Sequence, residues 1–176
     1  MSEQQRTIAK DIFLNGVGLH SGQAVSVRVL PAPPDAGIVF IRTDLPHRPT
    51  IPVKEQVLDI NKSVRRTTLS KGGIEIQTVE HILSALWGAG IDNAYIEISG
   101  PEVPGLDGSA LPYYQQFIAA QTVMQEKPRR YFLLREPVFV QEGDAAIAVF
   151  PDRSLKLSYM LSYPHPALKS QFVSFH

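Results

Sequence analysis

The sequence contains no cysteine among its 176 residues. Disulfide scaffolds, cysteine-ligated zinc, iron–sulfur clusters and thiol nucleophiles are therefore excluded together. A transition metal bound by this chain would have to be held by His, Asp or Glu side chains.

Surplus charge and long apolar runs are missing as well. The 17 Lys and Arg residues balance 17 Asp and Glu residues. Binding a run of phosphates requires an excess of basic side chains, so we expect no nucleic-acid partner. No stretch is long and apolar enough to cross a bilayer, and the first residues lack the apolar segment of a leader. We therefore expect a cytoplasmic protein without a membrane span.

What is present is typical of a globular α+β fold, because 44% of the residues are hydrophobic and their period changes along the chain. Alternating or short apolar runs predict strands, at residues 6–14, 24–30, 38–42, 67–70, 74–78 and 93–99. The segment Lys71-Gly72-Gly73 predicts a hairpin turn. Apolar residues at helical spacing predict a helix from Val79, with Thr78 as its N-cap. A second helix is expected after Ser109, which would be its cap.

The second part of the chain has a different pattern. Residues 1–125 predict a complete first domain, and the polar, proline-bearing segment 126–130 predicts a linker. Residues 131–176 predict strands with no helix to cover them, at 131–134, 138–140, 145–150 and 155–161. The sequence therefore predicts that 131–176 form the opening strands of an incomplete second domain.

Among the five histidines, His81 alone stands beside a carboxylate in a predicted helix. The positive end of a helix favours an ionised Glu80 and a neutral His81 imidazole. A neutral imidazole can bind a metal ion, and an ionised carboxylate can take a proton from a metal-bound water. The alternative is structural: a glutamate in a first helical turn complements the helix dipole, and a lone helical histidine is commonly an ordinary surface or core residue.

Three other segments are candidates for function. The loop 101–110 contains Asp107 and Ser109, and the loop 16–22 is rich in glycine. Turn formation and helix capping explain both equally well. Two dibasic pairs, at 65–66 and 129–130, could meet phosphates or could form a solvated face.

In their order along the chain, five motifs closely resemble the zinc-dependent UDP-3-O-acyl-N-acetylglucosamine deacetylases of lipid A biosynthesis. They are Gly16-Val-Gly-Leu-His-Ser-Gly22, Arg42-Thr-Asp-Leu45, Thr78-Val-Glu-His-Ile-Leu83, Gly90-Ile-Asp-Asn93 and Pro101-Glu-Val-Pro-Gly-Leu-Asp-Gly-Ser-Ala110. The resemblance covers nearly the whole chain from Arg6. Gly105 departs from it, because the family usually has a bulky apolar residue there.

The resemblance implies a site. His81 would be a zinc ligand, Glu80 the general base, and Leu19 would lie against the acyl chain of the substrate. The reaction implied is hydrolysis of the N-acetyl group of UDP-3-O-acyl-N-acetylglucosamine, which releases acetate. The family fold implied is two similar α+β domains, and the family suggests a monomer.

Members of this family continue beyond residue 176, and the further segment carries the other two zinc ligands, a His and an Asp, and a late general-acid His. Neither His165 nor His176 supplies that pair. Two interpretations stay open: a fragment of an active deacetylase, or a non-catalytic domain that folds or binds a partner half without a complete zinc site.

Overall fold

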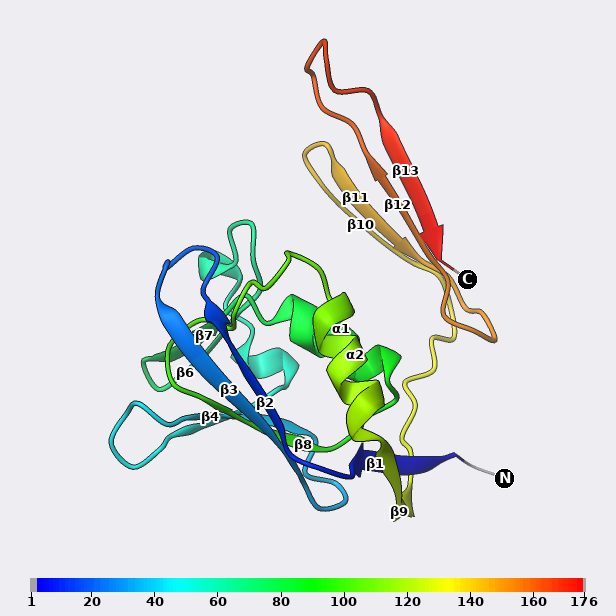
Figure 1. Ribbon diagram of the computed structural model, residues 1–176. Helices are drawn as coiled ribbons and strands as arrows, with labels where there is room; N and C mark the ends of the chain where they lie inside the picture. The colour runs from blue at the N-terminus through cyan, green and yellow to red at the C-terminus, as the bar shows by residue number, and fades with distance from the viewer. Residues whose placement is uncertain (1–2, 176) are drawn as a thin grey trace. The chain divides into compact units, whose positions relative to one another are not determined.

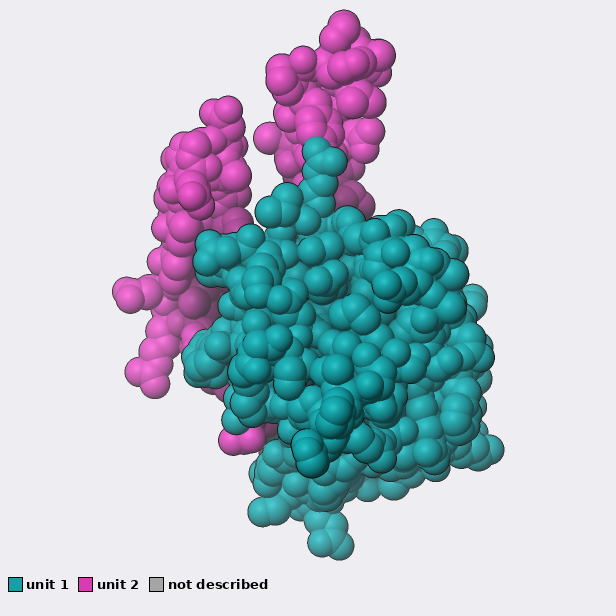
Figure 2. Space-filling view, turned by 90° about the vertical axis from the view of Figure 1, so that its left-hand side faces the viewer, with its two compact units in different colours: residues 1–129 teal, residues 130–176 magenta. Residues whose placement is uncertain are grey.

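The computed structural model describes residues 3–175, and the chain divides into two compact units, residues 1–129 and 130–176 (Figure 2). The first unit contains a five-stranded sheet whose strand order is β2-β3-β8-β4-β5. The bounds are β2 Ile12–Val17, β3 Ala24–Pro31, β4 Ile38–Arg42, β5 Thr50–Pro52 and β8 Ala94–Ile98. Neighbouring strands run antiparallel, except that β4 and β8 are parallel.

Two helices, α1 (Glu80–Gly88) and α2 (Leu111–Ala120), pack against each other beside this sheet (Figure 1). The predicted period of three to four residues is confirmed in α1, where Ile82 and Leu86 are fully buried. They share one hydrophobic cluster with the inward side chains of β3 and with Phe117 of α2. The fold class is α+β, as the sequence predicts.

Short elements complete the first unit. The 3-10 helices η1 (Glu55–Val57) and η2 (Ile60–Lys62) precede a hairpin of β6 (Thr68–Lys71) and β7 (Ile74–Gln77). The predicted turn between these strands is confirmed, since Gly72 and Gly73 both have positive φ angles, 59° and 79°. Glycine adopts this conformation without steric cost, which is what a two-residue hairpin turn requires.

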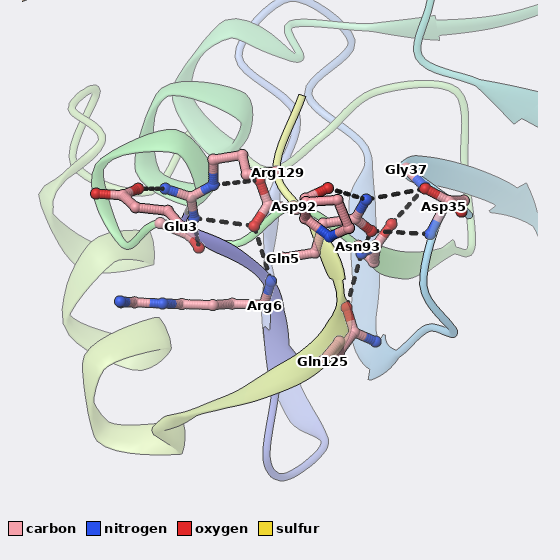
Figure 3. Close-up of polar contacts among 11 residues, drawn as sticks. Glu3, Gln5, Arg6, Asp35, Gly37, Asp92, Asn93, Gln125 and Arg129 are labelled. Atoms are coloured by element: carbon pink, nitrogen blue, oxygen red, sulfur yellow. Dashed lines mark hydrogen bonds and ion pairs between the residues drawn. The ribbon is translucent and has the colours of Figure 1, made fainter. Parts of the chain in front are cut away.

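The division between the two units falls inside the predicted linker 126–130, but the first residues of this segment form the end of a strand. Strand β9 runs from Thr122 to Pro128 and pairs antiparallel with β1 (Gln4–Ile8). Arg129 then binds both carboxylate oxygens of Asp92, at 2.8 and 2.9 Å (Figure 3). Backbone pairing with a strand more than 110 residues away decides the conformation of this polar segment, and local composition does not carry that information.

Two other expected boundaries also differ. The expected strand 6–14 is interrupted, because the N–H of Ala9 donates to the carbonyl of Gln121 and the chain bends before β2. Residues 131–134 are not a strand. A short apolar run does not by itself determine a strand, because strand formation depends strongly on tertiary context.

The second unit consists of two separate hairpins. They are formed by β10 (Val138–Glu142) with β11 (Ala145–Val149), and by β12 (Leu157–Leu161) with β13 (Gln171–Phe175). Strand β13 is not among the strands that the sequence predicts. Large apolar side chains are exposed on both hairpins, among them Ile147 and Phe172. That residues 131–176 belong to an incomplete second domain stays a prediction, and the exposed apolar side chains are consistent with it. Across the described residues, no helix is long and apolar enough to cross a membrane.

Candidate functional site

The proposed catalytic residues begin helix α1. Glu80 is the first residue of the helix and His81 the second, and both side chains are partly buried. The carboxylate Oε2 of Glu80 accepts a hydrogen bond of 2.9 Å from the backbone N–H of Thr67. Within the described residues, the second carboxylate oxygen and the ring of His81 make no hydrogen bond. One oxygen of Glu80 is therefore fixed, and the other is available to accept a proton.

Thr78 is not the N-cap that the sequence predicts. Its φ angle is +59°, and its hydroxyl donates to Oε1 of Glu102 at 2.8 Å instead of accepting from the helix. A β-branched residue with this backbone conformation is unusual and indicates a position held by its surroundings. Ser109 is not the N-cap of α2 either, because that position is taken by Ala110, although the Oγ of Ser109 accepts a hydrogen bond of 3.1 Å from the N–H of Leu111, the first residue of the helix.

Glu102 is the buried carboxylate of this region, with 1% of its surface exposed. Beside the Thr78 hydroxyl, it accepts from the backbone N–H of His20 at 2.9 Å and of Ser21 at 2.7 Å. Burial alone would raise the pKa of Glu102, but the hydrogen bonds from Ser21, His20 and Thr78 outweigh it and lower that pKa to about 2. The group is ionised at neutral pH and held by uncharged donors.

Leu19 lies in the loop that wraps this carboxylate. Its side chain is 63% exposed, and its Cβ lies 3.3 Å from the position that a Cβ on Gly105 would occupy. The loop is joined to the segment 100–105, because the N–H of Gly105 donates to the carbonyl of Val17. Gly105, the departure noted in the sequence, is therefore the residue that packs against Leu19.

Asp107 is the acidic side chain of the same segment that the sequence singled out. It accepts hydrogen bonds from both the N–H and the hydroxyl of Ser109, at 2.9 Å each. These bonds lower the pKa of Asp107.

The residues present fit a metal site only in part, because they supply one candidate ligand, His81. The described part of the chain contains no group of three His, Cys, Asp or Glu side chains able to hold a metal ion together. His81 offers an unbonded imidazole, which is the ligand type that zinc prefers, and Glu80 precedes it. In the second unit, Nδ1 of His165 accepts from the N–H of Ala167. His176 lies outside the described residues.

Sequence reasoning missed two parts of this site. The backbone N–H of Thr67 donates a hydrogen bond to Glu80. A pattern of side chains in the sequence does not predict a backbone donor. Glu102 stands in a segment rich in glycine and proline, in which the sequence singled out Asp107 and Ser109 instead. The one available signal was an acidic residue in a short run of prolines and valine, Pro101-Glu-Val-Pro104.

Comparison with known proteins decides the family. The family model described as UDP-3-O-acyl N-acetylglycosamine deacetylase (LpxC) matches residues 5–176. The chain belongs to the UDP-3-O-acyl N-acetylglycosamine deacetylase family. Among curated members of this deacetylase family, proteins named UDP-3-O-acyl-N-acetylglucosamine deacetylase are similar to the chain over nearly its whole length.

The relative from Syntrophus aciditrophicus is 42% identical over 173 residues, which are 98% of this chain and 53% of the relative. The relative from Geobacter sp. strain M21 is 38% identical over 97% of this chain and 55% of its own length. The deacetylase from Thermosynechococcus vestitus is 42% identical over 97% of this chain and 59% of its own length. The chain spans about half the length of the curated deacetylases it matches.

Proposed function

We propose that the protein carrying this chain hydrolyses the N-acetyl group of UDP-3-O-acyl-N-acetylglucosamine in lipid A biosynthesis. The products would be UDP-3-O-acyl-glucosamine and acetate. The observation that carries the proposal is the carboxylate of Glu80, with one oxygen held by the Thr67 N–H and the other without a bond, next to a histidine whose ring is also unbonded. Membership of the deacetylase family supplies the substrate class.

Each residue would have one role. Glu80 accepts the proton of the attacking water, and the water oxygen adds to the acetyl carbon. The carbon–nitrogen bond then breaks, and the leaving nitrogen takes a proton from a general acid that would come from outside residues 1–176, while the proton on Glu80 returns to solvent. The Thr67 N–H holds one oxygen of the Glu80 carboxylate in place, and the other oxygen accepts the proton. Leu19 would contact the acyl chain with its exposed side chain.

His81 would be one ligand of a zinc ion, and the remaining ligands would come from outside residues 1–176. When bound, zinc lowers the pKa of a bound water to about 7 and polarises the amide carbonyl. We also propose that the protein is cytoplasmic and monomeric.

The proposal is tested with the full gene product that carries these residues. Purified protein should release one acetate for each UDP-3-O-acyl-glucosamine formed, and a zinc chelator should stop the release. UDP-N-acetylglucosamine without the 3-O-acyl chain should be a much poorer substrate, because the contact with Leu19 is lost. Failure to release acetate from the acylated substrate in the presence of zinc would contradict the proposal.

A further inference from the structure

A single buried carboxylate joins the two segments on which the proposed function depends. Glu102 accepts backbone hydrogen bonds from the loop that contains Leu19 and a hydroxyl hydrogen bond from Thr78, two residues before helix α1. We propose that Glu102 is a positioning residue, which fixes the Leu19 loop and the first turn of α1 relative to each other. The proposal rests on the proposed function, since it concerns the alignment of Leu19 with Glu80 and His81.

On the loop side, the chain closes tightly around the carboxylate. A Cβ on Gly18 would lie 2.4 Å from Oε2 of Glu102 and 2.3 Å from Oγ of Ser21, so the loop has room for glycine alone. The N–H groups of His20 and Ser21 both point to the carboxylate. The backbone on the C-terminal side of Leu19 is thereby anchored, although the Leu19 side chain is exposed. This arrangement suits a residue that must present an apolar side chain at a fixed place.

On the helix side, the hydrogen bond to Glu102 holds a backbone conformation that threonine rarely adopts. Thr78 has its φ angle in the left-handed region, and two residues later the helix begins with Glu80. The neighbouring backbone is tied to the same segment, because the N–H of Gln77 donates to the carbonyl of Pro101 and the N–H of Val103 to the carbonyl of Gln77. The direction in which α1 leaves this point, and with it the place of Glu80 and His81, depends on these bonds.

The identity of the side chain matters because every hydrogen-bonding partner of Glu102 is a donor. Within the described residues it has no ion pair, so its negative charge is balanced by N–H and O–H dipoles alone. An ionised carboxylate accepts on both oxygens. A glutamine in its place would present an NH₂ group to at least one donor. Fully satisfied buried polar groups of this kind make the surrounding backbone rigid.

The test compares variants on the two sides of Glu102 in the full gene product. Thr78→Val removes the hydroxyl with little change in volume, Thr78→Ser retains it, and Gly18→Ala disturbs the loop side. Thr7→Val is the matched control: Thr7 is buried in β1, and its hydroxyl donates to the carbonyl of Asn93 at 2.7 Å and accepts from the N–H of Ala32 at 3.0 Å. The readouts are kcat, KM and amide hydrogen exchange at residues 18–22 and 78–82.

We expect Thr78→Val to lower kcat by about 10- to 100-fold through misplacement of Glu80 and His81, with a smaller change in KM. Thr78→Ser should restore kcat to within about threefold of the parent. Gly18→Ala should act mainly on KM. Amide exchange should accelerate at residues 18–22 and 78–82 in Thr78→Val, whereas Thr7→Val should leave both kcat and these amides near the parent values although it removes a buried hydroxyl with two hydrogen bonds.

Equal kcat in the Thr78→Val and Thr7→Val proteins, or unchanged exchange at residues 18–22 in Thr78→Val, would overturn the positioning role. Should Thr78→Val fail to fold, a Gly18→Ala protein with parental KM and exchange would overturn it as well. Glu80→Gln is measured in parallel. A fully active Glu80→Gln protein would contradict the proposed function, whereas an inactive one beside an unaffected Thr78→Val protein would contradict the positioning role alone.

Discussion

Replacing Glu102 by glutamine should change the stability of the chain in a manner that depends on pH. The pKa of this carboxyl is lowered from 4.5 to about 2 in the folded chain. Each unit of pKa difference between the folded and unfolded chain corresponds to about 1.4 kcal/mol, so the ionised group contributes about 3 kcal/mol to the free energy of unfolding. Because the pKa is depressed on folding, this contribution is present above about pH 4.5 and is lost as the pH falls to about 2.

The assay is urea-induced unfolding of the 176-residue chain between pH 7 and pH 2, for the parent and for Glu102→Gln. We expect the variant to be less stable by about 3 kcal/mol at pH 7, and we expect the difference to narrow below pH 4.5. The carboxyls of Asp44, Glu75 and Asp107 also have lowered pKa values. They are present in both proteins and cancel in the difference.

Glu126→Gln provides the control, since Glu126 is exposed and its side chain makes no hydrogen bond or ion pair within the described residues. It should leave the free energy of unfolding within about 0.5 kcal/mol of the parent at every pH. A Glu102→Gln protein as stable as the parent at pH 7, or one whose deficit does not change with pH, would refute the reasoning.

Two further expectations concern the 176-residue chain expressed alone. It should bind zinc weakly in a calorimetric titration and release no measurable acetate, because one imidazole cannot replace a complete ligand set. Tight equimolar zinc binding with turnover would show that the proposed site is misplaced. Its backbone amides after residue 131 should exchange rapidly while those of Val79–Leu86 are protected, because the hairpins of the second unit expose their apolar side chains. Uniform strong protection in a monomeric sample would count against an incomplete second domain.

The periodic segments of this chain could be predicted from the sequence, because a buried face repeats. The alternation of Val25, Val27 and Val29 in β3 and the helical spacing of Ile82 and Leu86 in α1 are confirmed as buried. Strand β9 could not be found in this way. Its side chains are mostly exposed, and its conformation comes from pairing with β1 at the other end of the first unit.

In the candidate site too, the residues within a periodic segment could be predicted from the sequence, and those that depend on tertiary contacts could not. Glu80 and His81 are visible in the sequence because a helix signal surrounds them, and the motif carries the family resemblance. The predicted role of Thr78 was wrong. A threonine before a helix predicts an N-cap, but in the folded chain its hydroxyl donates to Glu102. The buried environment of Glu102 is formed by three segments that meet in space. The spacing of residues along one segment therefore could not predict it.

The central claim is that Glu80 is the general base and His81 a zinc ligand, and the most direct measurement compares turnover and bound zinc in two variants of the full gene product. Glu80→Gln should lower turnover by about 10² to 10⁴ while zinc content stays near that of the parent. His81→Ala should lower zinc content itself, and activity should recover only partly at high zinc. If Glu80 merely complements the helix dipole, its replacement costs about 0.3 to 1 kcal/mol of stability and leaves turnover intact. Unchanged turnover in Glu80→Gln, with zinc bound, would contradict the account.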